Sequence, residues 1–163
     1  MKLYLRKADR GDFEELNRLI KQVDLMHHRN LPNIFKNNPP PARSPEYLFS
    51  IIDDDNKDII VAESENKLLG FVVIHKKFTP DITVLFDREY AVIDNIAVDK
   101  EYRRKGIGKA LMKKAHKWAR KKGITKIELN VFEFNKNALQ FYKNLGYKTR
   151  SRKMAINLGR KEN

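Results

Sequence analysis

Residues 94–111 read DNIAVDKEYRRKGIGKAL, and this stretch combines the most specific local signals in the chain. A strand-like apolar run ends at Val98, a basic turn follows, and two glycines one residue apart, Gly106 and Gly108, precede an amphipathic helical pattern. Glycines let a ligand approach the backbone closely, and the first turn of a helix presents unpaired N–H groups at the positive end of its dipole. The stretch therefore predicts an anion site, for which a pyrophosphate is the natural ligand.

Two well-known phosphate-binding loops do not fit these residues. A P-loop requires Ser or Thr after its Gly-Lys pair and an earlier glycine, whereas this chain has Ala110 and Arg103 at those places. The dinucleotide-binding pattern requires a third glycine where this chain has Leu111. The remaining alternative is a glycine pair that serves only a tight strand-to-helix turn.

Positive charge gathers around the same stretch. The net charge is +13, from 34 Lys and Arg against 21 Asp and Glu, and residues 100–126 alone hold twelve basic side chains against one acidic, or +11. Residues 148–163 contribute +5, so the remainder is close to −3. A basic stripe on an otherwise balanced chain indicates a phosphate-bearing partner, either a nucleic acid or a nucleotide cofactor, and composition does not choose between them. For many of these side chains the alternative is a solvated helix face.

Length and composition narrow the class of protein. A chain of 163 residues is near the commonest domain size, so we expect one domain over residues 1–163. The absence of cysteine excludes disulfides, thiolate metal sites and a cysteine nucleophile. No apolar run reaches the length of a membrane span, and the first residues lack the apolar stretch of a signal peptide. These features predict a soluble, cytoplasmic protein.

Strand and helix patterns alternate along the chain. Helix signals follow Asp9 and Ser44, run from Gly106 to Lys122, and follow Asn135, whereas the prolines of residues 30–41 predict a loop. We expect strands at residues 3–7, 59–63, 68–76, 90–98 and 125–132, with two more at 147–150 and 154–158. The middle strands follow one another in hairpin order, which favours a mixed sheet covered by helices over a purely parallel one.

These elements resemble the GNAT superfamily of acetyl-CoA-dependent N-acetyltransferases. Residues 103–108, RRKGIG, match the family motif (Gln/Arg)-x-x-Gly-x-(Gly/Ala), and residues 137–147, NALQFYKNLGY, look like the family signature around Phe-Tyr-x-x-Leu-Gly. Residues 94–98 and 128–131 resemble its fourth and fifth strands. The resemblance covers nearly the whole chain and is weakest from Asp24 to Pro41.

The resemblance implies an α/β fold of the α+β type. Its centre would be a mixed, mostly antiparallel sheet of six to seven strands, splayed between the fourth and fifth and flanked by about four helices. Acetyl-CoA would lie in the gap, with its pantetheine arm along the fourth strand and its pyrophosphate on the glycine turn. The cofactor-binding residues so implied are Ile96, Ala97, Val98, Arg103, Arg104, Lys105, Gly106, Ile107, Gly108, Lys109, Asn130, Asn137 and Tyr142.

The activity implied is direct transfer of the acetyl group to a primary amine in a ternary complex. The amine would belong to a small or polyamine-like molecule, or to a peptide or protein. It must lose a proton before it attacks, and the departing thiolate needs one. Tyr142 matches the family's proton donor, although an aromatic residue beside Phe141 also suits a core. Asp94 is the candidate base and would act directly or through water. Relatives usually carry Glu at this position. The alternative is that Asp94 only forms hydrogen bonds on the strand face.

The acceptor and other partners are less well marked. His27, His28 and Phe35 fall where the family builds its acceptor pocket, although a polar helix end is the simpler interpretation. No metal site is expected, because His75 and His116 are isolated. We expect neither a membrane nor a specific nucleic acid as partner, and the family's tendency to dimerise leaves a homodimer open.

Two alternatives to an acetyltransferase remain. The basic stripe would suit a nucleic-acid-binding module, although no helix-turn-helix, zinc-finger or RNA-recognition pattern accompanies it. A non-catalytic sensor of acyl-CoA would keep the glycine turn but would have no need of Tyr142.

Overall fold

A computed structural model describes residues 1–37 and 40–159, which divide into two units, Met1–Asn130 and Val131–Asn163. The first unit contains, in chain order, β1 (Tyr4–Lys7), α1 (Phe13–Asn30), α2 (Pro45–Ile52), β2 (Lys57–Ser64), β3 (Lys67–Phe78), β4 (Glu89–Val98), α3 (Ile107–Lys121) and β5 (Ile127–Leu129). Short 3-10 turns, η1 (Arg10–Asp12) and η2 (Lys100–Tyr102), precede α1 and α3. The described part of the second unit contains α4 (Lys136–Asn144).

The sheet has five strands in the order β1-β2-β3-β4-β5. The first four are antiparallel neighbours, and β5 runs parallel to β4, so the predicted mixed and mostly antiparallel sheet is confirmed. The expected count of six to seven strands is wrong for the part of the chain that the structure describes.

The two expected strands at residues 147–150 and 154–158 are absent. These residues have no regular secondary structure, and Met154, Ile156 and Leu158 are all exposed. Alternating apolar residues suit a strand, but a strand also needs a neighbouring edge to pair its backbone groups. Within its own unit this segment has no such edge among the described residues.

Local sequence accounts for where the helices begin. Asp9 and Asp12 form a capping box that leads through η1 into α1, and the side chain of Ser44 accepts a hydrogen bond from the N–H of Tyr47 at the start of α2. Asn135 caps α4 in the same way, as its spacing predicted.

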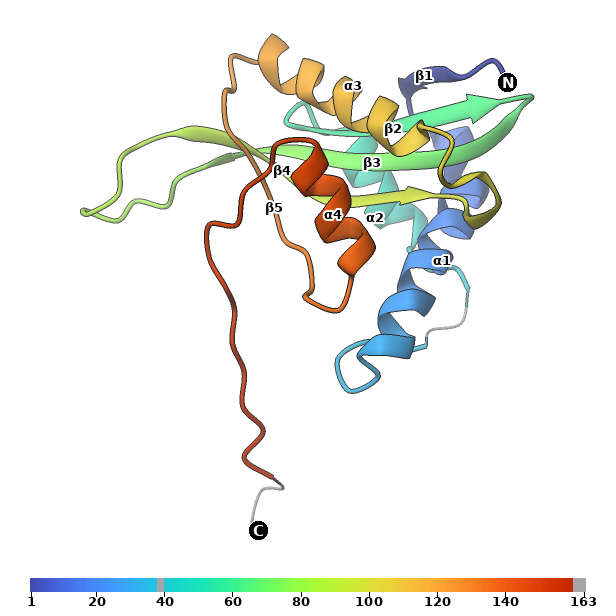
Figure 1. Ribbon diagram of the computed structural model, residues 1–163. Coiled ribbons are helices and arrows are strands. Elements are labelled where there is room, and N and C mark those ends of the chain that lie inside the picture. The colour runs from blue at the N-terminus through green and yellow to red at the C-terminus, as the bar shows by residue number, and fades with distance from the viewer. Residues whose placement is uncertain (38–39, 160–163) are drawn as a thin grey trace. The chain divides into compact units, whose positions relative to one another are not determined.

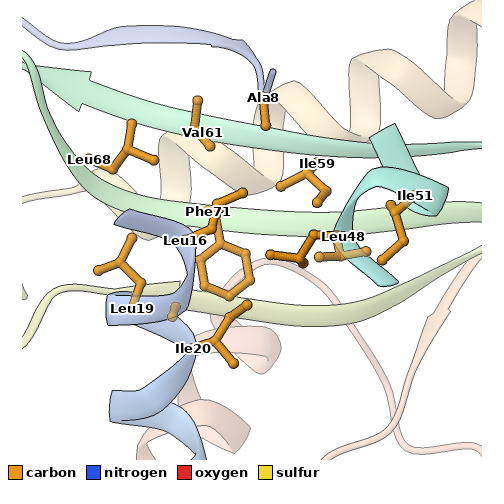
Figure 2. Close-up of a cluster of buried hydrophobic side chains, with 12 residues drawn as sticks. Ala8, Leu16, Leu19, Ile20, Leu48, Ile51, Ile59, Val61, Leu68 and Phe71 are labelled. Carbon is orange, nitrogen blue, oxygen red and sulfur yellow. The ribbon is translucent and has the colours of Figure 1, made fainter. Parts of the chain in front are cut away.

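Helices cover both faces of the sheet in the first unit, with α1 and α2 on one face and α3 on the other (Figure 1). Successive strand residues point to opposite faces. Figure 2 shows the core on the first face, where Phe71 of β3 packs among Leu16, Leu19 and Ile20 of α1 and Leu48 of α2. The opposite core is formed by buried residues of the strands and of α3, namely Ile60, Val72, Ile74, Leu111, Met112, Ala115 and Trp118.

Strand β5 is much shorter than the predicted strand 125–132. It pairs with β4 only from Ala91↔Ile127 to Ile93↔Leu129, whereas β4 continues to Val98. The far half of β4 therefore lacks a strand on its β5 side within the described residues. No helix in residues 1–37 or 40–159 combines the length and the apolar character needed to span a membrane.

Candidate active site

The predicted glycine turn joins the end of β4 to the start of α3. Gly106 is the N-cap of α3 and adopts the left-handed conformation, with φ +81°, that glycine tolerates best. No side chain caps this helix, and its first backbone bond runs from the N–H of Ala110 to the carbonyl of Gly106 at 3.0 Å. The N–H groups of Ile107, Gly108 and Lys109 therefore precede the helical ladder, at the positive end of the helix dipole.

An ion pair between the buried Asp99 and the partly exposed Arg18 fixes the strand end that leads into this turn. The carboxylate of Asp99 accepts hydrogen bonds from the guanidinium of Arg18 on α1 and from the backbone N–H of Glu101, the latter at 3.2 Å. The backbone N–H of Asp99 donates to the carbonyl oxygen of Leu69 at 2.8 Å. Burial alone would raise the pKa of Asp99, but the Arg18 hydrogen bond and the Glu101 N–H outweigh it, so the pKa is lowered. Asp99 thus remains ionised and holds the turn against α1.

The side chains of the turn have unequal roles. Arg104, Lys105 and Lys109 are exposed, so their charges face solvent around the helix start. Arg103 donates from Nε to the carbonyl of Val98 at 3.2 Å and folds back over the end of β4. Ile107 is buried, so of the predicted cofactor-binding residues it can offer a ligand only its backbone.

The far half of β4 presents an open backbone edge beside this turn. Ile96, Ala97 and Val98 pair with Val72, Phe71 and Gly70 of β3 on one side, and no described strand pairs with them on the β5 side. Asn130, just after β5, is exposed. An extended ligand with amide groups could add to such an edge through main-chain hydrogen bonds.

Asp94 lies at a β-bulge in the middle of β4. The register passes from Val73↔Asn95 to Ile74↔Ile93, so Asp94 is the extra residue on the bulged strand. Its side chain is 48% exposed, and Oδ2 lies 2.9 Å from Nε2 of His75 on β3. Bulges often re-aim a side chain next to an active site, and this one presents a carboxylate to solvent.

A pocket of about 280 Å³ lies beside the bulge in the first unit. Its polar lining is Asp94, Asn95, Arg43 and Tyr47, and its apolar lining comes from α1, α2 and β3 through Ile20, Leu48, Ile51, Phe71 and Val73. The guanidinium of Arg43 is already held by both carboxylate oxygens of Asp24, at 2.8 and 3.2 Å. Among the described residues, Asp94 forms no salt bridge with Lys or Arg. Its carboxylate is therefore the charged group of the pocket that is available to a ligand.

The three residues predicted for the acceptor are brought together elsewhere. Nδ1 of His28 lies 2.7 Å from the carbonyl oxygen of Phe35, and the ring of Phe35 packs 4.8 Å from that of His27 at the end of α1. Nδ1 of His27 lies 3.0 Å from the carbonyl oxygen of Val23 in its own helix. These residues pack against the following loop, and none of them lines the pocket beside Asp94.

The second unit contains the predicted proton donor. Tyr142 of α4 is 9% exposed, and its ring packs 5.3 Å from that of Phe141 and 5.8 Å from that of Tyr147. Burial raises the pKa of Tyr142 to about 12, so the phenol keeps its proton across the physiological range. Asn137 is exposed within α4, and the cap is Asn135 two residues earlier.

Sequence reasoning did not identify Tyr47, Arg43 or His75 as neighbours of the site. Tyr47 and Arg43 surround the predicted start of α2, and only packing of that helix against the sheet brings them to β4. In the sequence, His75 is an isolated histidine. The predicted pairing of strands 68–76 and 90–98 could have suggested that His75 lies near Asp94. The bulge that brings the two side chains together cannot be predicted from the sequence pattern.

Comparison with known proteins identifies the family to which this chain is similar. Residues 25–147 match the acetyltransferase (GNAT) family. The uncharacterized N-acetyltransferase MJ1207 of Methanocaldococcus jannaschii is 38% identical over 101 residues, which cover 62% of this chain and 43% of that protein. Streptothricin acetyltransferase A of Bacillus subtilis is 33% identical over 95 residues, covering 58% and 55% respectively.

Among solved structures, a variant of the BH1408 protein of Bacillus halodurans superposes with a TM-score of 0.91 at 28% identity, covering 95% of this chain and 99% of that one. The chain spans about half the length of the two curated relatives named above. The family match covers most of the chain, including β4, the glycine turn, α3 and α4. The chain therefore belongs to the acetyltransferase (GNAT) family.

Proposed function

We propose that the chain is an acetyl-CoA-dependent N-acetyltransferase that acts on a primary amine, with residues 1–163 working as one catalytic domain. The observation that carries the proposal is the start of α3, where Gly106 turns the backbone, no side chain caps the helix, and Arg104, Lys105 and Lys109 are exposed around it. A helix N-terminus of this kind favours a pyrophosphate. The two relatives named above are both acetyltransferases by name.

The residues fit the parts of acetyl-CoA. The N–H groups of residues 107–109 and the side chains of Arg104 and Lys105 would hold the phosphates, and the open edge of Ile96–Val98 would pair with the amide groups of the pantetheine arm. Asn130 and Asn137 are proposed to bond the rim of the same arm. The molecule supplies the activated acetyl group; the chain supplies its binding and the proton transfers.

The proton transfers assign a role to two side chains. An ammonium acceptor loses two protons on becoming an amide. Asp94, directly or through water, takes the first and leaves a neutral amine that attacks the acetyl carbonyl. The hydroxyl of Tyr142 gives a proton to the departing sulfur, so that CoA leaves as a thiol. The second proton lost by the amine replaces the one that Tyr142 has given up. Backbone N–H groups near Ile96 and Ala97 would stabilise the oxygen that becomes negative on attack.

The acceptor proposed from the pocket is a small primary amine with an aliphatic body. Asp94 attracts an ammonium group, and apolar side chains such as Ile20 and Val73 form the other wall. A panel of small amines, peptides and proteins incubated with acetyl-CoA and analysed by mass spectrometry tests this assignment. Acetylation of protein or peptide amines with no small amine modified would refute the pocket as the acceptor site.

Cofactor binding is tested by two matched glycine variants. Gly106 and Gly123 lie at opposite ends of α3, both have positive φ, and a Cβ added at either meets nothing within 4 Å. Gly106→Glu and Gly123→Glu thus add the same strain and charge, but only the first places a carboxylate at the phosphate site. We expect calorimetry to show acetyl-CoA affinity at least about tenfold lower, roughly 1.4 kcal/mol, for Gly106→Glu and near wild type for Gly123→Glu. Equal acetyl-CoA affinities for the two variants would show that the phosphates do not bind at the glycine turn.

The basic surface provides a second test. Acetyl-CoA affinity should fall as salt rises, because both the ligand and its surroundings are highly charged. Thermal-shift measurements should show stabilisation by CoA species and little by oligonucleotides at physiological salt. Stabilisation by one DNA or RNA sequence, with none by CoA, would instead identify the chain as a nucleic-acid-binding module.

The role of Tyr142 is tested against its neighbour Tyr147. Burial raises the pKa of both phenols to about 12, and replacement by Phe removes only a hydroxyl from each. We expect Tyr142→Phe to lower kcat by about 10²–10⁴-fold with acetyl-CoA affinity unchanged, and Tyr147→Phe to have little effect on kcat. Tight acetyl-CoA binding by a chain that acetylates no amine in the panel would favour a non-catalytic sensor.

A further inference from the structure

One buried titratable side chain beside the proposed site has no role so far. His75 of β3 lies opposite Val92 of β4 and Lys57 of β2, in the middle of the sheet, and its side chain is 12% exposed. Its Nε2 atom is buried and lies 2.9 Å from Oδ2 of Asp94, and it forms no hydrogen bond among the described residues. Leaving a buried polar atom unsatisfied costs free energy, which makes a histidine at this place informative.

The bulge in β4 is what creates this pair. Val73 and His75 share one face of β3, because side chains alternate along a strand. Asn95 lies opposite Val73 and Val92 lies opposite His75, so the extra residue between them turns Asp94 toward the same face. The carboxylate consequently has one edge against His75 and another in the pocket.

The surrounding charges favour a neutral imidazole in the resting protein. Burial, the largest influence, lowers the pKa of His75, and Lys77 and Lys57 lower it further, whereas Asp94 raises it. Asp54, which follows α2, also interacts electrostatically with His75. Because the pKa lies below its ordinary value near 6.5, the ring is mainly neutral at pH 7, and one of its two nitrogens has a free lone pair.

We infer that Nε2 of the neutral His75 ring carries no proton and receives the one that Asp94 takes from the acceptor ammonium, so that the two side chains act as one base. The inference rests on the function proposed above. An N–H bond of the ammonium breaks, the proton binds a carboxylate oxygen of Asp94, and it then passes to Nε2 of His75. The result is an imidazolium beside a carboxylate, an ion pair at 2.9 Å. The exposed edge of Asp94 returns the proton to water after the amine has reacted.

This arrangement answers a difficulty of a lone aspartate. The ordinary pKa of Asp is about 3.9, far below that of an alkylammonium at about 10.4, so a solvated carboxylate is a weak acceptor for its proton. Coupling to an imidazole moves the final proton site to a group whose ordinary pKa lies much nearer neutrality. His75 contacts Asp94 and does not line the pocket, so it acts through Asp94.

A test that needs no turnover is NMR titration of the histidine rings in the wild type and in Asp94→Asn. Since Asp94 raises the pKa of His75, we expect that pKa to fall in the variant. His116 on α3 is an internal control: burial and Arg120 lower its pKa, and its titration should be the same in both proteins. An unchanged titration of His75 would show that the two side chains are not coupled and would overturn the inference.

The kinetic test compares pH profiles of kcat/KM for the wild type, His75→Gln and His75→Leu. Gln keeps a polar amide near Asp94 but cannot take up the proton, and Leu removes both the polar group and the proton acceptor. We expect His75→Gln to lose about tenfold in kcat, part of the 10²–10⁴-fold that a general base contributes, and to shift its acidic limb toward lower pH. His75→Leu should lose more, with acetyl-CoA affinity unchanged in both variants.

His116→Gln provides the matched control, because it replaces another half-buried histidine on a different element. It should keep the wild-type rate and profile. A wild-type rate and pH profile in His75→Gln would overturn the inference while leaving the proposed function intact. If the wild type acetylates no amine, the proposed function fails, and the NMR titration still decides whether His75 and Asp94 form a pair.

Discussion

Gly70 in β3 is the position where the addition of a single methyl group should most directly disturb the strand that leads into the site. It pairs with Val98 of β4, and a Cβ built on its backbone would lie 2.6 Å from the carbonyl oxygen of Ala97 and 3.1 Å from Cδ1 of Leu111. Ordinary van der Waals contact begins near 3.4 Å, so the carbonyl would have to move by 0.8 Å. A backbone oxygen in a strand cannot rotate away as the end of a side chain can.

The expected cost follows from two opposing effects. Overpacking a well-filled core typically costs about 1–3 kcal/mol, whereas removing a glycine from the unfolded chain returns about 0.4–1 kcal/mol. We therefore expect Gly70→Ala to lower the free energy of unfolding by roughly 1–2 kcal/mol. For a chain of this size that corresponds to a Tm lower by about 2–8 °C. Acetyl-CoA affinity should fall as well, because Ala97 and Val98 belong to the proposed pantetheine edge.

Thermal unfolding followed by circular dichroism measures the first effect, and calorimetry with acetyl-CoA measures the second. Gly70→Ala made in a Leu111→Ala background separates the two collisions. Removing the Leu111 side chain relieves the 3.1 Å contact but not the contact with the carbonyl, so most of the cost should remain. A Tm for Gly70→Ala at or above that of the wild type would refute the reasoning, and full rescue in the Leu111→Ala background would assign the collision to the side chain.

Three further predictions concern stability. Because the pKa of Asp99 is lowered in the folded chain, its contribution is present above the unfolded value of about 3.9 and is lost as pH falls through the lower folded value. Asp99→Asn should therefore be about 2 kcal/mol less stable near pH 7, with a difference that shrinks below pH 4 in urea titrations; a gap that is constant with pH would contradict the ion pair with Arg18. Trp118→Phe deletes the 3.0 Å hydrogen bond from the indole to buried Asp58 and should cost about 1–3 kcal/mol in the same assay, whereas an unchanged midpoint would argue against that bond. Asn135→Ala removes the cap of α4 and should cost about 1 kcal/mol, seen as faster amide exchange in that helix, and unaltered exchange would show that the cap is dispensable.

Much of the fold could be predicted because its signals are local. The caps at Asp9, Ser44 and Asn135 and the glycine turn before α3 depend on residues within one helical turn, and all were found where expected. The hairpin of β2 and β3 followed from the short polar turn between two apolar runs, whereas the longer segment 79–88 joins β3 to β4. The expected strand at 154–158 failed although its alternation is clear, since pairing requires an edge that alternation cannot supply.

By itself, the sequence predicted most of the elements, the glycine turn proposed to bind an anion, and the resemblance that singles out Asp94 and Tyr142. The tertiary structure decided which distant side chains meet. Asp94 touches His75 because one extra residue in β4 shifts the register, and Tyr47 reaches the pocket because α2 packs on β2. Register and helix packing are set by contacts between residues far apart in the chain, where a shift of one residue reverses the face that each side chain occupies. Local patterns do not contain that information, so the proposed partner of the base could be recognised only once the strands were paired.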